Sequence, residues 1–207
     1  MKFIPLMAAL TITAALPFQA IGASPDAITK CDRLAAHPDD PDHVGVGVPS
    51  SKVNLPKAVA ECGRELQRQP DNHRIRYQYA RSLAYSGKWA EAAPELKKAA
   101  DGGYRQAQFV YGLFIDRKRD GVPHDICIAE QYWLKAARNG RQHARVLYVD
   151  EYLKGKFSGC QPGATTGEMT TLLDSASADA SDFYERLLVA NLKRQLAAQS
   201  TVKFDLE

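Results

Sequence analysis

The side chains best suited to binding a metal ion lie in one short segment near the N-terminus. His37, Asp39, Asp40, Asp42 and His43 all fall within residues 37–43. Neutral imidazoles and carboxylates this close together could hold a divalent ion. The same stretch is rich in proline and glycine, and Asp and Pro are common turn formers, so a solvated loop with aspartates capping its turns is the favoured explanation of these residues. We expect the loop and no metal site.

Motifs of known catalytic chemistry are almost absent. The sequence has no G-x-S-x-G nucleophile elbow, no H-E-x-x-H zinc motif and no G-x-x-x-x-G-K-[ST] phosphate loop. Ser200 and Lys203 match the S-x-x-K of serine β-lactamases, but no S-D-N or K-T-G accompanies them. The match falls in residues 200–207, which we expect to form a flexible tail. The sequence therefore predicts no catalytic residues and no cofactor.

The N-terminus has the three parts of a secretory signal peptide. Residues 1–2 supply a positive charge, residues 3–15 are almost wholly apolar, and small residues follow at 22–24. A membrane anchor is the alternative, but Pro17 interrupts the apolar stretch, which falls short of the ~20 residues that a spanning helix needs. The pattern predicts cleavage near Ala23, with 1–23 as signal peptide, and a periplasmic or secreted protein without a membrane span after cleavage.

An internal repeat indicates the secondary-structure elements that would position any site. The motif A-A-x-x-G at residues 99–103 recurs at 136–140, and Ala107 recurs as Ala144, which gives a period of 37 residues. Ala58 and Ala92 are 34 apart, the tetratricopeptide spacing. Such periods are typical of helical solenoids, in which each helix pair buries its apolar face against the next pair. We therefore predict an all-α solenoid of stacked antiparallel helix pairs.

Residues 24–199 are expected to form a single helical-repeat domain, and capping residues, helix breakers and apolar stripes mark the helices within it. The expected units are helix pairs at about 25–69, 73–101, 105–139 and 142–177, with a capping helix at 182–198. A solenoid needs such a helix to cover its final apolar face. The residues expected to pack against the stack are Phe183, Leu187, Leu188, Leu192 and Leu196.

The repeat also predicts how the four cysteines pair. An even number of Cys in an oxidising compartment indicates disulfides, and the absence of a C-x-x-C pair argues against a zinc or redox site. We expect bridges Cys31–Cys62 and Cys127–Cys160, because each joins residues about one helix pair or one repeat apart, which stacking brings together. Four buried thiols are the alternative.

The residues at the junctions between pairs resemble the Sel-one-like repeat, a branch of the tetratricopeptide superfamily. The matching positions are Ala107-Gln108, Tyr111-Gly112, Gly121-Val122, Asp125, Ala129, Trp133, Ala136-Ala137 and Gly140. The opening of the chain around Cys31 is similar to repeat proteins exported by alphaproteobacteria. The resemblance covers about residues 25–150 and implies an adaptor in an envelope, secretion or signalling assembly. Some cysteine-rich members of this family have been described as penicillin-binding.

A stripe of tyrosine and basic residues is the main functional signal. In tetratricopeptide-like units the first helix of each pair lines the concave face, and aligning the units makes Tyr77, Tyr111 and Tyr148 equivalent. Tyrosine buries a large area at small entropy cost and arginine binds carboxylates, a profile typical of recognition surfaces. The alternative is that these tyrosines pack between helices. The predicted partner-binding groove comprises Tyr77, Arg81, Tyr85, Tyr111, Arg119, Tyr148, Tyr152 and Lys156.

These features favour a binding protein over an enzyme. Lys and Arg number 27 against 24 Asp and Glu, a balance that does not favour nucleic-acid binding. We expect an exported scaffold whose concave groove binds a protein or peptide partner, acidic or carboxylate-bearing, without catalysis. The alternative is an envelope hydrolase, or a protein that binds peptidoglycan fragments or β-lactams, which would need a convergent Ser/Lys or carboxylate site. The sequence specifies neither the partner nor the oligomeric state.

Overall fold

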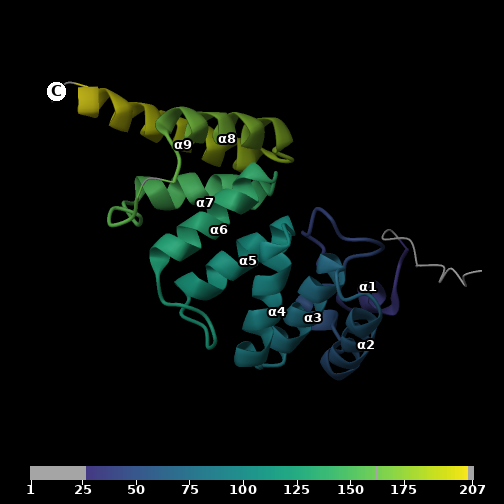
Figure 1. Cartoon of the computed structure of the whole chain (residues 1–207). Coiled ribbons are helices and arrows are strands. Elements are labelled where there is room, and N and C mark those ends of the chain that lie inside the picture. The colour runs from purple at the N-terminus through teal and green to yellow at the C-terminus, as the bar shows by residue number, and fades with distance from the viewer. Residues whose placement is uncertain (1–26, 162, 205–207) are drawn as a thin grey trace, which may run out of the picture.

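The structure, a computed structural model, describes residues 27–161 and 163–204. The expected signal peptide at 1–23 lies outside the described residues. Within the described ranges the chain forms helices and loops without a strand, and the helices stack in sequence order (Figure 1). None of the helices in this part of the chain is long and apolar enough to cross a membrane. The all-α stack of helix pairs predicted from the repeat is confirmed.

Four helix pairs and a closing helix make up the described stack. Consecutive helices contact each other along the chain, with α1 and α2 at one end and α8 and α9 at the other (Figure 1). The pairs are α1 (Lys30–Ala35) with α2 (Leu55–Arg68), α3 (His73–Tyr85) with α4 (Trp89–Asp101), α5 (Arg105–Asp116) with α6 (Ile126–Arg138), and α7 (Gln142–Leu153) with α8 (Thr166–Asp179); η1 (Ser50–Lys52) precedes α2 and α9 (Phe183–Phe204) closes the stack.

Local signals set the helix boundaries. The first helix was expected to begin near residue 25, but it begins at Lys30, because Thr29 and Asp32 form a capping box that satisfies backbone amides at this point. At the two A-A-x-x-G junctions the backbone of Gly103 has φ 88° and that of Gly140 has φ 82°. Residues with a Cβ are strained in this region, so glycine ends each second helix and turns the chain into the next pair.

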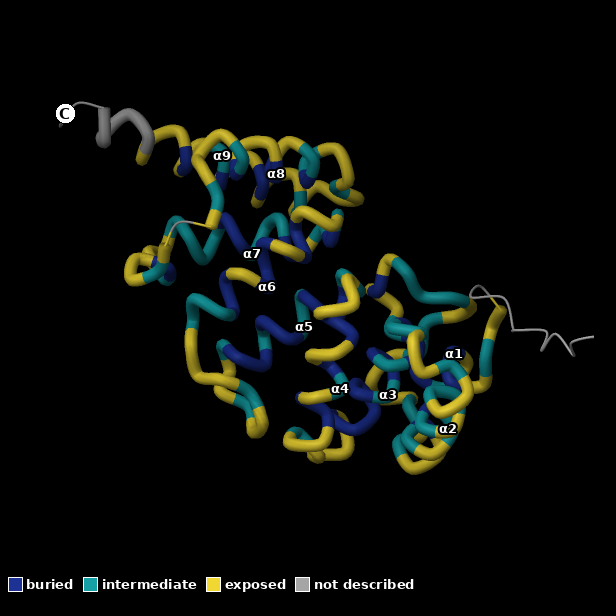
Figure 2. Tube along the Cα trace, viewed as in Figure 1, coloured by how far each residue is buried: buried dark blue, intermediate teal, exposed yellow. Residues whose placement is uncertain are grey.

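The core lies where the helices of successive pairs meet, and Figure 2 shows the buried residues following these contacts. Alanines at the repeat positions, such as Ala99 and Ala136, are fully buried and let helices approach closely. Trp133 is also fully buried, and its indole Nε1 donates a hydrogen bond to the carbonyl of Phe109 at 3.2 Å. A Cβ at Gly112 would collide with this indole, so the glycine allows α5 and α6 to pack at this distance.

The closing helix differs from the expectation in length and orientation. It continues to Phe204, where a tail from residue 200 was expected, and residues 205–207 lie outside the described part. Leu192 and Leu196 pack against the stack as predicted, together with Val189. The expectation was wrong for Phe183, Leu187 and Leu188, which are 63%, 49% and 46% exposed, because the buried stripe of α9 runs through positions 189, 192 and 196. Side chains from residue 200 onward, including the S-x-x-K match, are not described.

The structure pairs the cysteines as the repeat predicted. Cys31 of α1 bonds Cys62 of α2, and Cys127 at the start of α6 bonds Cys160 in the loop after α7. The first bridge fastens the short α1, and the second fastens the irregular segment between α7 and α8. Both bridges therefore hold elements that have few neighbours of their own.

Replacing the first pair in a Cys31→Ser/Cys62→Ser variant is expected to lower the free energy of unfolding by about 3–4 kcal/mol, because the bridge constrains the unfolded chain. Urea denaturation measures the loss, with Cys127→Ser/Cys160→Ser as the matched comparison, since the two bridges span 31 and 33 residues. Peptide mapping without reductant checks the pairing. Free thiols or a link between Cys31 and Cys127 would contradict it.

Candidate functional site

A cavity of about 340 Å³ lies between α3, α5, the start of α7 and the loop after α1. We call it the inner cavity. Helices α3, α5 and α7 are the first helices of their pairs, those expected to carry the binding face. The charged and aromatic side chains of its wall are Arg81, Arg117, Arg119, Arg141, His37, His143, Asp39, Tyr77, Tyr85, Trp89, Phe109 and Phe114.

Two of the arginines in this wall are buried. Arg81 is 5% exposed and Arg141 is 4% exposed. Among the residues that the structure describes, neither forms an ion pair with a carboxylate. Buried charges in proteins are normally paired, so the inner cavity carries an excess of positive charge in a region of low dielectric.

Arg81 is held mainly by backbone carbonyls. Its Nη1 donates to the carbonyl of Ala35 at 2.7 Å and its Nη2 to that of Val48 at 2.9 Å. The guanidinium lies 4.9 Å from the ring centre of Tyr85. Its Nε is buried and has no hydrogen-bond partner. One donor of this buried cation thus has no hydrogen-bond partner.

Arg141 is held by neutral groups. Its Nε donates to Oε1 of Gln106 at 2.5 Å, and its Nη1 lies 2.7 Å from Nδ1 of His143. The guanidinium also lies 5.2 Å from the ring centre of Phe109. Burial lowers the pKa of Arg141 from its usual value. The guanidinium is therefore in a poorly solvated position. The carboxylates of Asp39 and Asp40 act on its charge, but no carboxylate of the described residues forms an ion pair with it.

Two histidines, His37 and His143, line the inner cavity together with Arg81 and Arg141. Burial, and then the charge of Arg81, lowers the pKa of His37 to about 4. His143 is exposed at the mouth, where partial burial and the charge of Arg141 lower its pKa. Nδ1 of His37 accepts a hydrogen bond from the backbone amide of Asp39 at 3.0 Å. Both imidazoles are consequently neutral at neutral pH.

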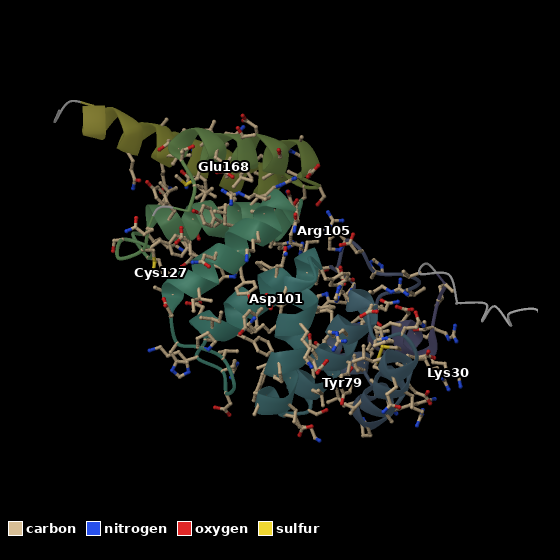
Figure 3. All side chains as sticks on the ribbon, in the orientation of Figure 1. Lys30, Tyr79, Asp101, Arg105, Cys127 and Glu168 are labelled. Atoms are coloured by element: carbon tan, nitrogen blue, oxygen red, sulfur yellow. A yellow bond between two sulfur atoms is a disulfide. The ribbon has the colours of Figure 1, made fainter. Side chains whose placement is uncertain are left out.

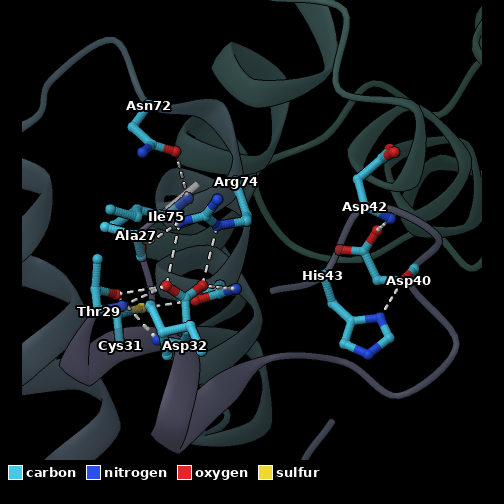
Figure 4. Close-up of polar contacts among 12 residues, drawn as sticks. Ala27, Thr29, Cys31, Asp32, Asp40, Asp42, His43, Asn72, Arg74 and Ile75 are labelled. Carbon is cyan, nitrogen blue, oxygen red and sulfur yellow. Dashed lines mark hydrogen bonds and ion pairs between the residues drawn. The ribbon is translucent and has the colours of Figure 1, made fainter. Parts of the chain in front are cut away.

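The loop that carries His37 is tied to the stack by its aspartates. Asp40 accepts a hydrogen bond from the Tyr104 hydroxyl at 2.7 Å, and Asp42 binds Arg105 through both carboxylate oxygens at 2.6 and 2.7 Å. Arg105 is labelled in Figure 3, and Asp40, Asp42 and His43 of the loop are labelled in Figure 4. This corrects the expectation of a solvated loop, because Asp40 is buried and anchors the loop.

The expected turn role of the loop aspartates is seen at one point, where Asp40 accepts a hydrogen bond from the backbone amide of Asp42 at 3.0 Å. Burial raises the pKa of the Asp40 carboxyl. No three His, Cys, Asp or Glu side chains in the described ranges are grouped so that they could hold a metal ion. The loop thus shapes the rim of the inner cavity.

The three aligned tyrosines belong to the core. Tyr77, Tyr111 and Tyr148 are 2%, 2% and 1% exposed, so the expectation that they are partly exposed was wrong. Tyr77 nevertheless borders the inner cavity. The ring of Tyr111 meets that of Tyr132 edge to face at 4.8 Å, and the Tyr148 hydroxyl donates to Glu130 at 3.0 Å. Tyr111 and Tyr148 both contact α6, whereas Tyr77 contacts Tyr104 and Gln106 at the start of α5.

The other predicted groove residues fall in different places. Arg81, Tyr85 and Arg119 line the inner cavity, and the Arg119 guanidinium lies 4.3 Å from the ring centre of Trp89. Tyr152 lies beside a separate cavity near the loop after α7. Lys156 forms ion pairs with Asp116 at 2.7 Å and Glu151 at 2.8 Å, so its charge is locally balanced. A single stripe along all three first helices is therefore not present.

The alignment missed the residues of α5 and α7 that complete the inner cavity. Aligning the repeats presumes that equivalent residues of each first helix face the partner. The inner cavity instead lies between α3 and α5, and most of the residues of α3 that line it are not equivalent to those that line it from α5. The sequence did contain one signal: α5 carries apolar residues beyond its buried face. Three of them, Phe109, Val110 and Leu113, are only half-buried in the structure. Arg141 and His143 gave no comparable signal.

Comparisons with known proteins give little beyond the fold. No protein-family model matches the chain, and no curated protein matches it. The chain is similar to a Sel1 repeat protein from Oxalobacter formigenes of known crystal structure, with 21% identity and a TM-score of 0.49. The similarity covers 63% of this chain and 52% of that protein, so the chain spans about half the length of this relative.

Proposed function

We propose that the protein is an exported scaffold that binds a protein or peptide partner in the inner cavity, without catalysis. The observation that carries the proposal is the combination of four arginines with an aromatic and apolar wall in one cavity. Apolar walls with a few charged groups are typical of ligand sites, and the volume is within the usual range. The two disulfides are compatible with an oxidising compartment such as the periplasm.

The space available to a ligand extends beyond the inner cavity. A second cavity of about 410 Å³ lies between α5, α7 and α9, and Phe109 and His143 line both. Its wall is mainly apolar, with Val146, Leu147 and Leu188. A peptide is an occupant suited to this arrangement, because it could place an acidic group in the inner cavity and an apolar side chain in the second.

The proposal predicts that partner capture depends on Arg117, which is exposed, and on the half-buried Arg119 of the inner cavity. Arg117→Glu/Arg119→Glu is expected to reduce capture from a native envelope extract at least tenfold, because reversed charges repel an acidic partner and slow its association. Lys97→Glu/Lys98→Glu on α4 is the matched control, since it changes the net charge equally on exposed residues outside the cavity.

Capture is measured by crosslinking from a photoreactive residue at position 113 in the cavity, with the same residue at position 91 of α4 as the reference site. Circular dichroism verifies that each variant is folded. Equal capture by the two charge-reversed variants, or equal crosslinking from both positions, would rule out the inner cavity as the binding site.

A further inference from the structure

We propose that the end of the inner cavity formed by Arg81, Arg141 and His37 is a carboxylate-binding site, and that binding takes up a proton. The inference deepens the proposed function, because it names the group that the partner presents. It stands on the two buried arginines described above and on the imidazole of His37, which lines the same cavity. A short carboxylate ligand can test it without the partner.

Arg74 is a buried arginine of the same protein that does have a carboxylate partner. Asp32 is fully buried and binds Arg74 through Nε at 3.0 Å and Nη2 at 3.1 Å, as drawn in Figure 4. Arg81 and Arg141 are buried to a similar degree, yet they have backbone carbonyls, a glutamine and a histidine where Arg74 has a carboxylate. Asp39 and Asp40 act on the charge of Arg141 without forming an ion pair with it, so a ligand anion would supply the direct partner that these arginines lack.

The donors suit a carboxylate. Nε of Arg81 is buried without a hydrogen-bond partner, and Arg141, the other buried cation of the same wall, is held by neutral side chains. Charge-assisted hydrogen bonds from arginine to a carboxylate are about twice as strong as neutral ones. Phe109 and Val110 provide apolar contact beside these donors. The site thus fits a carboxylate that carries an apolar neighbour.

The proton uptake follows from the charges around His37. It faces Arg81 from α3, Arg141 and His143 from the start of α7, and Asp39 of its own loop. The buried Asp40 and Tyr77 adjoin the same end, and Glu185 of α9 acts on His143. Burial contributes most to the lowered pKa of His37, and the charge of Arg81 contributes next. An anion that offsets Arg81 and Arg141 therefore makes the protonated imidazole more favourable. Binding therefore raises the pKa of His37 from about 4.

Three acetylated tripeptides serve as probes: Gly-Gly-Phe with a free C-terminus, Gly-Glu-Phe amide and the neutral Gly-Gln-Phe amide. Isothermal titration calorimetry at pH 7 and pH 5, in two buffers of different ionisation enthalpy, gives affinity and protons bound. We expect either or both carboxylate peptides to bind at least tenfold more tightly than the neutral one, more tightly at pH 5 than at pH 7, and with proton uptake. The first two peptides distinguish a C-terminal carboxylate from an acidic side chain.

Variants locate the site. Arg141→Gln is expected to weaken binding of the carboxylate peptides about tenfold or more, whereas Arg117→Gln at the other end of the cavity is expected to change it less than threefold. His37→Asn with His143→Gln should retain binding at pH 7 and lose the proton uptake. Equal binding of the neutral peptide, no effect of Arg141→Gln, or uptake unchanged in the histidine variant would overturn the proposal.

Should Arg141→Gln fail to fold, the histidine signals of the wild-type protein decide by nuclear magnetic resonance. Saturating carboxylate peptide is expected to raise the pKa of His37, and an unchanged titration curve would overturn the proposal. The outcome is separable from that of the proposed function. Tripeptide binding without partner capture would uphold the carboxylate site and reject the scaffold role, and capture without tripeptide binding would do the reverse.

Discussion

Tyr111→Ala is expected to lower the free energy of unfolding by about 3–5 kcal/mol, because it removes a large aromatic side chain from a packed core. Tyr111 is 2% exposed and packs edge to face on Tyr132. Tyr85→Ala is the matched control, since Tyr85 is 39% exposed, and its cost should remain below about 1 kcal/mol. Urea denaturation followed by circular dichroism measures both.

Comparing Tyr111→Ala with Tyr85→Ala distinguishes a tyrosine that packs in the core from one that contacts a partner. If Tyr111→Ala left the unfolding transition unchanged and abolished partner capture, Tyr111 would belong to the binding surface and the packing described above would be contradicted. A similar loss of stability in both variants would show that exposure does not separate their roles.

Asp32→Ala is expected to cost about 3–5 kcal/mol, because removing one partner of a buried ion pair leaves the other charge uncompensated. The carboxylate is fully buried and accepts hydrogen bonds from Arg74, from Nε2 of Gln78 at 2.9 Å and from the Thr29 backbone amide at 2.8 Å. Its loss would therefore affect the capping box of α1 as well as the contact with α3.

Asp42→Ala provides the contrast for this second prediction. Asp42 also binds an arginine through both oxygens, but its side chain is 37% exposed and that of Arg105 is 27% exposed. Exposed pairs contribute about 0–1 kcal/mol, so this variant should unfold near the wild-type denaturant concentration. An equal cost for the two substitutions would contradict the distinction between buried and exposed pairs.

The sequence predicted the stack because the signals for it are local and repeat. Gly103 and Gly140 mark equivalent turns, and the buried alanines between them identify the contact faces. The cysteine pairing followed from the same spacing. The orientation of α9 did not, since its apolar residues occupy more than one side, and only contact with α7 and α8 selects the buried stripe.

The candidate site was predicted only in part, for a physical reason. Arg81, Tyr85 and Arg119 were identified from the repeat, and they do line the inner cavity. The remaining wall comes from a loop outside the repeat and from the first residues of α7, so its composition depends on how the loop folds back over the stack. The hydrogen bond between Asp40 and Tyr104 that holds the loop there cannot be predicted from the spacing of residues along the chain.

The folded-back loop has a consequence for how the repeats unfold. In a solenoid each unit contacts only its neighbours, so opening can spread from one end unit by unit. Here Asp42 bonds Arg105, and Arg105 also donates to the carbonyls of Asn139 and Gly140 at 3.3 and 3.2 Å, just before α7. The first helix pair is thereby joined to the third and to the start of the fourth. Opening of the N-terminal pair therefore also breaks the contacts that Asp40 and Asp42 make two units away, so its effect is not confined to the neighbouring pair.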